Sequence, residues 1–229
     1  MGQRLILGAV SLGAALDASV TDRRQTCGER GRCQNGPMTW ESLPPRPGPG
    51  ATPRMQLAEL AAAVGEVEAA LACAALLAAN DPAEQPELLL YLGGSAGQSV
   101  LDSGSWKPYW ARVWGARGLL YVWADSVAPD VVAGLGDEHW RVAEMCVKVA
   151  TRREIGAAGD GAARLAGHEL PRVRAAAVRA LGRVGDTEHV AVVEAVVDDE
   201  AAEVRRSGVR ALRQLAQRLD LELDRPDVY

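Results

Sequence analysis

The sequence contains no phenylalanine, and lysine occurs only at Lys107 and Lys148, so almost every basic residue is an arginine. No apolar run reaches the length of about 18 residues that a membrane-spanning helix needs. The motifs HExxH and GxSxG are absent, and the glycine-rich residues 93–97 lack the Gly-Lys-Ser/Thr ending of a P-loop. The sequence therefore predicts no membrane partner and none of the enzyme classes that these motifs mark.

Cysteine usage and charge limit the compartment and the partners. The four cysteines form no CxxC motif, which favours a reducing compartment over a disulfide-stapled protein. The first 20 residues resemble a signal peptide only weakly, because Asp17 interrupts the small-residue end and no Ala-x-Ala site follows. We therefore expect a cytoplasmic protein. The net charge of -5 disfavours nucleic acid and anionic membranes, since both bind positive surfaces.

A Pro/Gly-rich run at residues 43–50 divides the chain, because proline and glycine at this density hold neither helix nor sheet. We expect a disordered tail at residues 1–54, N-terminal helices at residues 55–105 and helical repeats at residues 106–229. Met55 opens the first amphipathic stretch directly after the run. A native start at Met55 is therefore an alternative to a long tail.

Apolar residues recur at three- and four-residue steps between residues 55 and 80, which predicts one long helix or two helices joined near Gly65. Residues 80–82, Asn-Asp-Pro, end this pattern, and residues 84–92 predict a short helix. We interpret the glycines of residues 93–97 as a flexible connection between helices. The predicted apolar face consists of Leu57, Leu60, Val64, Val67, Leu71 and Ala75.

The segment from residue 106 onward repeats every 31 residues. Residues 171–181 align with residues 202–212, with identities at Val, Arg, Val, Arg, Ala and Leu. A step of 31 residues back gives a conservative match at residues 142–149 and another gives a looser match at residues 111–119. A looser terminal match is expected where a repeat caps a stack. The sequence therefore predicts about four repeated units.

Each unit is punctuated as a pair of helices. In the clearest unit, residues 173–184 predict an amphipathic helix, residues 185–187 a turn with an N-cap, and residues 190–197 a second helix. One pair cannot bury both apolar stripes alone, so the pairs must stack. Small residues at equivalent positions would let the stacked helices approach closely, namely Gly115, Cys146, Ala177 and Gly208. We predict an all-α fold, an α-α superhelix of helical repeats.

The repeated pattern is Val-Arg, then Ala-Val-Arg-Ala-Leu, then Gly-Asp and a second helix. It resembles the short HEAT repeats, including those first described in phycobilisome lyase subunits, over residues 106–219. The resemblance implies a HEAT-like solenoid in which the first helix of each pair lies outside. The second helix would then line the concave, ligand-facing surface.

The resemblance also implies bonds between neighbouring repeats, formed by the arginine after the valine and by an acidic residue. In this sequence these residues are Arg174 and Arg205 on one side and Asp137 and Asp199 on the other. His168 replaces the acid in the third unit, and Ala143 replaces the arginine in the second. We therefore expect an incomplete series of such bonds.

Charged residues segregate between the two helices of a unit. Residues 171–184 contain arginine and no acid, whereas residues 185–200 contain acids and neither Arg nor Lys. If the implied layering holds, the concave groove is acidic and the partner is another protein, with a basic surface. Alternatively, the two faces are solvated and their opposite charges bridge. The candidate partner-binding residues on the second helix are Glu188, Glu194 and Asp198.

Large aromatic residues gather where the repeats begin. Trp110 and Trp114 lie four residues apart and therefore share one helix face. Side chains of this size are efficient interface anchors, which makes both of them candidate partner-binding residues. We favour the alternative, in which they are buried in a cap between the N-terminal helices and the repeats.

No arrangement typical of catalysis or metal binding occurs. The three histidines are far apart in the sequence, and Cys27 with Cys33 lacks two further ligands at suitable spacing. We predict no cofactor, no metal and no enzymatic activity, but a non-catalytic scaffold or adaptor that mediates protein–protein interaction. The alternatives are a lyase- or chaperone-like subunit and a DNA-binding HEAT-like glycosylase. Both need a groove aromatic or carboxylate poised for chemistry.

Overall fold

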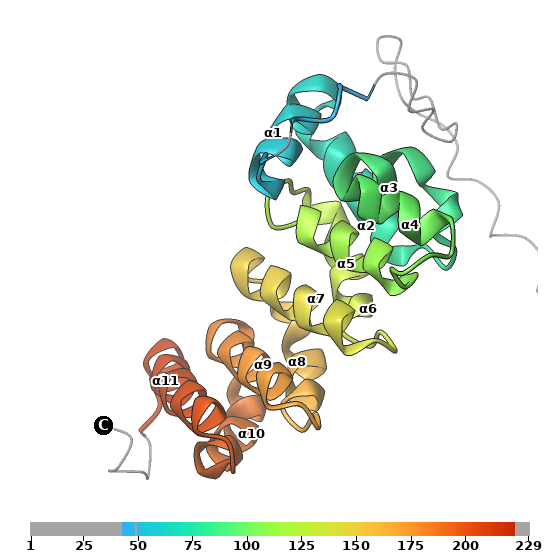
Figure 1. Ribbon diagram of the computed structural model, residues 1–229. Helices are drawn as coiled ribbons and strands as arrows, with labels where there is room; N and C mark the ends of the chain where they lie inside the picture. The colour runs from blue at the N-terminus through green and yellow to red at the C-terminus, as the bar shows by residue number, and fades with distance from the viewer. Residues whose placement is uncertain (1–42, 49, 223–229) are drawn as a thin grey trace, which may run out of the picture. The chain divides into compact units, whose positions relative to one another are not determined.

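The computed structural model describes residues 43–48 and 50–222. The chain divides into two units, residues 1–39 and residues 40–229, and every described residue belongs to the second unit. These residues form eleven α-helices with short 3-10 helices between them and no strand (Figure 1). The all-α prediction is confirmed. Most of the predicted tail, with Cys27 and Cys33, lies outside the described residues.

The first helix begins two residues before the predicted boundary. α1 (Pro53–Val64) has a proline in its first turn, and the Thr52 hydroxyl accepts a hydrogen bond from the Met55 N–H at 3.3 Å. The described residues before α1 form no helix, as the Pro/Gly run predicts, but they contact the helices. Arg46 Nε donates to the Tyr91 carbonyl oxygen at 3.0 Å. Part of the predicted tail is therefore attached to the helical unit.

A glycine separates α1 from α2 (Glu66–Ala78). Gly65 has a φ of 96°, a backbone conformation that favours glycine, so two helices form instead of one. The break resets the helical phase, and Val67 (49% exposed) and Leu71 (44% exposed) face solvent. The prediction of one continuous apolar face is therefore wrong beyond Gly65. The buried face of α2 includes instead Ala69, Ala72, Cys73, Leu76 and Leu77.

The glycine-rich residues 93–97 do not form a flexible connection. α3 (Pro86–Gly93) follows a short 3-10 helix, and α4 (Ser95–Leu101) starts directly after Gly94, which has a φ of 56°. A Cβ atom at Gly97 would lie 2.5 Å from the Leu89 carbonyl oxygen, so the two helices can pack this closely only at a glycine. The prediction of a loop was wrong because these glycines serve helix packing.

The 31-residue period is confirmed by where the helices start. The first helices of successive units begin at residues 109, 140, 171 and 202, and the second helices begin at residues 128, 159 and 190. The first helices are α5 (Tyr109–Gly118), α7 (Trp140–Arg153), α9 (Pro171–Val184) and α11 (Ala202–Leu219). The second helices are α6 (Ala128–Gly134), α8 (Gly159–Leu165) and α10 (Val190–Ala195), each preceded by one turn of 3-10 helix. Three complete pairs and one further first helix are described.

Successive units stack through their first helices. α2 packs against α5, α5 against α7, α7 against α9 and α9 against α11. The second helices form another layer, in which α6, α8 and α10 pack against the first helix that follows each of them. No unit buries its apolar stripes alone, as the size of the pair predicts.

The predicted small residues lie where the stacked helices meet. A Cβ atom at Gly115 would lie 2.6 Å from the Cys73 carbonyl oxygen, and one at Gly208 would lie 3.1 Å from the Val196 carbonyl oxygen. Ala177 in the unit between is fully buried. The helices therefore approach closely at each of these positions, and a larger side chain would overpack them.

Candidate functional site

Charged side chains tie successive repeats together at two junctions. Arg112 on α5 donates hydrogen bonds to both carboxylate oxygens of Asp137, at 2.7 and 3.1 Å. Arg174 on α9 bonds Asp199 in the same way, with both distances 2.8 Å. In each pair the acid lies 25 residues after the arginine and immediately before the next first helix. We call each of these bidentate pairs a rung.

Each rung also shapes the linker before a first helix. Asp199 Oδ1 accepts the Ala201 N–H at 2.8 Å, and so caps the linker that leads into α11. Arg174 Nη1 donates to the carbonyl oxygens of His168 and Glu169, both at 3.0 Å. Arg174 therefore holds the linker before its own helix and the linker before the next helix.

The junction between α7 and α9 has no rung, as the resemblance predicts. Ala143 stands where the arginine would be, and His168 stands where the acid would be. His168 keeps the linker bond that Asp199 forms in the next unit, because its Nδ1 accepts the Leu170 N–H at 3.0 Å. Sequence reasoning missed Arg112, although it lies 31 residues before Ala143 and the period could have identified it.

The rungs shift pKa values in the direction expected for ion pairs. The hydrogen bonds from Arg174 hold the pKa of Asp199 below its ordinary value, although burial opposes this effect. The pKa values of Arg112 and Arg174 are raised, chiefly by their hydrogen bonds to Asp137 and Asp199. The rung at Arg174 therefore favours the charged forms of both its members, and the rung at Arg112 favours the charged form of that arginine.

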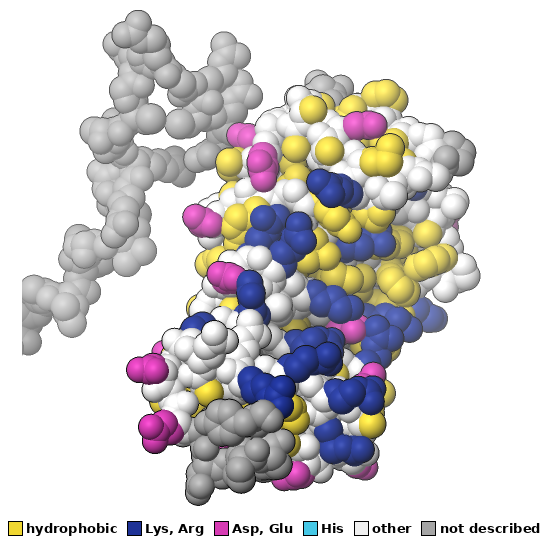
Figure 2. All heavy atoms as spheres, turned by 90° about the vertical axis from the view of Figure 1, so that its left-hand side faces the viewer, with side chains coloured by type: hydrophobic (Ala, Val, Ile, Leu, Met, Phe, Trp, Pro, Cys, Tyr) yellow, Lys and Arg dark blue, Asp and Glu magenta, His cyan; other side chains and the backbone are white. Residues whose placement is uncertain are grey.

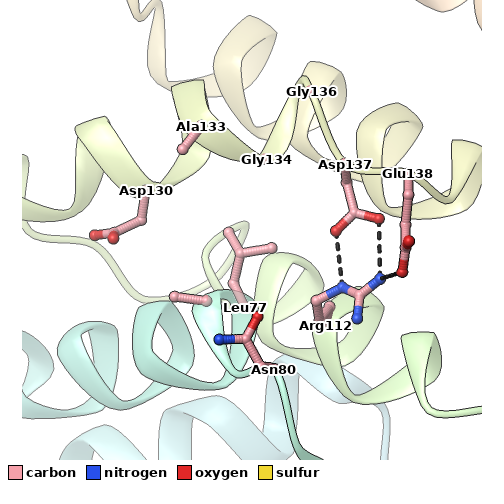
Figure 3. A pocket seen from close by; sticks show the side chains of 10 residues that line it. Leu77, Asn80, Arg112, Asp130, Ala133, Gly134, Gly136, Asp137 and Glu138 are labelled. Atoms are coloured by element: carbon pink, nitrogen blue, oxygen red, sulfur yellow. Dashed lines mark hydrogen bonds and ion pairs between the residues drawn. The ribbon is translucent and has the colours of Figure 1, made fainter.

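A pocket of about 430 Å³ lies beside the first rung. Figure 3 shows Leu77 and Asn80 on one side of it and Asp130 on the other, with Arg112 directed toward Asp137. Arg112 is the one cation among the described lining residues, and it is already bound to two carboxylates. The pocket therefore offers no unpaired positive charge to an anionic ligand.

The comparison with known families agrees with this geometry. The family model described as HEAT repeats matches residues 162–223, which span α9, α10 and α11. This protein contains HEAT repeats. The match does not identify the phycobilisome-lyase type of repeat, which stays a prediction. No curated protein matches the sequence.

The predicted acidic residues lie together on the second-helix layer of the HEAT repeats. Glu188 and Asp198 lie in the 3-10 turns on either side of α10 and are exposed, and Glu194 lies in α10 and is half-buried. Neither Glu188 nor Glu194 forms an ion pair with any described residue. Asp160 on α8 adds a further exposed carboxylate, which lies 3.4 Å from His189 Nε2. Glu188 and Glu194 therefore place negative charge on this layer that no ion pair among the described residues uses.

The two candidate tryptophans are packed within the N-terminal part of the HEAT-repeat protein. Trp114 is 5% exposed, and a Cβ atom at Gly93 on α3 would lie 2.5 Å from its ring. The Trp110 ring is half-buried, lies 6.1 Å from the Trp114 ring, and has the Arg141 guanidinium over it at 5.3 Å. The cap interpretation fits this packing, and Trp114 is too buried to serve as an anchor for a partner.

The first helices carry a regular column of cations, which agrees with the basic first helix predicted at residues 171–184. Positions 31 residues apart hold Arg117, Lys148, Arg179 and Arg210 on α5, α7, α9 and α11. Figure 2 shows Lys and Arg side chains gathered on one face of the molecule, with few Asp or Glu side chains among them. The two layers of HEAT-repeat helices therefore differ in charge, as the sequence predicts.

The remaining reactive side chains have structural surroundings. Cys73 and Cys146 are buried free thiols, and burial raises the pKa of Cys73 to about 12. The pKa of Cys146 is also raised by burial, so both stay protonated. No group of three His, Cys, Asp or Glu side chains in residues 43–48 and 50–222 could hold a metal ion. No helix in the same residues is long and apolar enough to cross a membrane.

Proposed function

We propose that this HEAT-repeat protein is a non-catalytic adaptor that binds another protein. HEAT repeats commonly act as protein-interaction scaffolds, because their stacked units present extended surfaces. One observation supports the proposal above the others. Two junctions between repeats are held by paired charges, whereas residues 171–184 carry arginine and no acid, and residues 185–200 carry acids and neither Arg nor Lys.

The acidic layer is the surface that we assign to a partner with a basic surface. Glu188 and Glu194 have no ion-pairing partner among the described residues, so a partner's Lys or Arg would not compete with an internal bond. Residues 187–198 contain three acids, Glu188, Glu194 and Asp198, and neither Arg nor Lys. Complementary charge of this kind steers partners and selects among them.

The test is affinity capture with the full chain as bait and a matched pair of charge-reversed variants. One variant carries Glu188→Arg and Glu194→Arg. The control carries Glu59→Arg and Glu87→Arg, which makes the same change of net charge on the exposed surfaces of α1 and α3. Captured proteins are quantified by mass spectrometry.

We expect the wild type and the control to recover the same specific proteins, and the Glu188/Glu194 variant to lose those with basic surfaces. Circular dichroism melting of all three proteins checks that the fold is retained. If no bait recovers a specific protein, the adaptor function is wrong. If every bait recovers the same proteins equally, the acidic layer is not the binding surface.

A further inference from the structure

We infer that the groove between α7 and α9 binds an acidic segment of a partner protein. This inference rests on the proposed function, since it assumes that the occupant is a protein. It concerns the layer of first helices, which is positively charged, whereas the layer around α10 with Glu188 and Glu194 is negatively charged. The adaptor would then have one surface for a basic partner and another for an acidic one.

The groove combines two rows of cations with an apolar floor. It has a volume of about 450 Å³, and its floor includes Val147 and Ala176. Its rims are formed by cations four residues apart on each helix, Lys148 and Arg152 on α7 and Arg179 and Arg183 on α9. Residues four apart lie on one helix face, so each rim presents two positive charges toward the groove.

Neighbouring groups hold several of these cations in place. Glu144 is buried and bonds Lys148 Nζ at 2.9 Å, and it also bonds Arg172 Nη2 at 3.0 Å. Arg179 Nη1 donates to the buried Ser207 hydroxyl at 3.1 Å. Positioned side chains lose less conformational entropy when a ligand binds, which favours recognition.

The groove retains more positive charge than its acidic neighbours neutralise. Glu144 is shared between two cations, and Glu154 pairs with Arg183. Arg152 forms no ion pair with any described residue, and Arg179 bonds only a neutral hydroxyl. Carboxylates of a partner would therefore meet cations whose charge is still uncompensated.

The positive surface continues beyond the groove to α11. A second groove of about 450 Å³ is lined by three cations, Arg205, Arg206 and Arg210, by one acid, Asp198, and by the apolar residues Val197 and Val209. Arg206 and Arg210 form no ion pair with any described residue. An extended acidic segment that crosses the α7–α9 groove would therefore meet further cations along the stack (Figure 2).

The lining of the grooves favours a protein segment over nucleic acid. Proteins that bind single strands stack bases on aromatic side chains, and no aromatic side chain lines either groove. The described aromatic cluster packs at the start of the repeats instead. The net charge of -5 also opposes non-specific binding to duplex DNA. Apolar floors between cations suit a chain with both acidic and apolar side chains.

Helix spacing suggests a suitable probe. Packed helices lie about 8–10 Å apart, and residues three apart in an extended chain are separated by about 10 Å. The probe is a fluorescein-labelled peptide of about twelve residues with glutamate at every third position and valine or serine between. Its control replaces every glutamate with glutamine. Binding to the full chain is measured by fluorescence anisotropy.

Two double variants in the groove and one double variant outside it separate the effect of local charge from the effect of net charge. The groove variants are Lys148→Glu with Arg179→Glu and the milder Lys148→Gln with Arg179→Gln. The control is Arg54→Glu with Arg164→Glu, at two exposed arginines on α1 and α8 that form no ion pair with described residues. Melting curves of every variant identify any that does not fold, and the glutamine variant keeps the test informative in that case.

We expect the wild type to bind the glutamate peptide and not the glutamine peptide, with an affinity that falls as salt rises. The Lys148→Gln/Arg179→Gln variant should weaken binding by about tenfold and the control by less than about twofold. Absence of binding to the wild type, or equal loss in the groove and control variants, overturns the inference. So does tighter binding of a single-stranded DNA of equal charge that is lost in the groove variants.

The failure of this inference differs from failure of the adaptor function. If the peptide does not bind while affinity capture still recovers specific partners, only the assignment of the α7–α9 groove is wrong. If capture recovers no protein, the adaptor function is wrong whatever the peptide does.

Discussion

The junction between α9 and α11 and the junction between α7 and α9 are built from the same repeat but are held differently. At the former, Arg174 bonds Asp199, and Arg205 Nη1 donates to the Asp199 and Glu200 carbonyl oxygens at 2.8 and 2.9 Å. At the latter, no rung exists, and Glu144 bonds Arg172 across the two first helices instead. One repeat pattern therefore tolerates two ways of joining its units, and the α7–α9 groove lies at the junction without a rung.

The largest effect should come from Arg174→Ala, because this guanidinium serves two linkers. The change leaves Asp199, whose side chain is 10% exposed, without its bidentate partner. We expect the free energy of unfolding to fall by about 3 kcal/mol. Urea denaturation followed by circular dichroism measures it.

The control for that prediction is Arg179→Ala on the same helix, an exposed arginine with one hydrogen bond to Ser207. It should cost less than about 1 kcal/mol. Equal losses of unfolding free energy in the two variants would mean that the rung stabilises the fold no more than a single exposed hydrogen bond does. The two junctions would then not differ in stability because of the rung.

A smaller effect should follow from building the missing rung with Ala143→Arg and His168→Asp. The new pair would have the same 25-residue spacing as the existing rungs. Glu138 and Glu200 follow the aspartates of those rungs, and Glu169 already follows His168 in the same way. We expect the double variant to gain about 1 kcal/mol of stability. Ala143→Arg alone should destabilise, because it buries an unpaired guanidinium.

His168→Asp alone should be nearly neutral, since aspartate also caps helix N-termini. A double-mutant cycle on urea denaturation measures the coupling between the two positions. Additive single effects would show that the α7–α9 junction cannot accommodate a rung, so that the two junctions differ in shape as well as in sequence.

The smallest effect should appear when pH is varied, because it weakens the rung without removing atoms. The folded pKa of Asp199 lies below its unfolded value, so its contribution is complete above the unfolded pKa of about 3.9. It is lost as pH falls through the lower folded pKa. The stability difference between wild type and Arg174→Ala should therefore shrink at acid pH, measured by thermal melting across the pH range. A difference that stays constant would show that Asp199 does not stabilise the fold through its charge.

The sequence predicted the repeats better than the helices before them, for a physical reason. Each repeat has the same apolar spacing and turn chemistry, so one clear unit locates the helices of the others. α2 and α4 have no such copies. Gly65 changed the phase of α2 through its positive φ, whereas Gly97 allowed α4 to pack against the Leu89 backbone where a loop was predicted.

The candidate surfaces were predicted in sign but not in detail. The composition of residues 171–200 separated basic from acidic layers, and the structure shows the same separation. Composition does not tell which charges pair, because Arg112 with Asp137 and Glu144 with Arg172 join residues 25 and 28 positions apart. The burial of Trp114 also depends on α3, which lies outside the repeats.

The 31-residue spacing makes the column of cations on the first helices repetitive, so its length is set by the number of units. A tandem duplication of residues 171–201 would insert a unit that brings its own arginine, its own capping acid and another cation in line with Arg179. A duplication of residues 140–170 would add the cation but no rung. A duplicated unit of residues 171–201 would therefore bring the rung that holds it to its neighbour, whereas a duplicated unit of residues 140–170 would not.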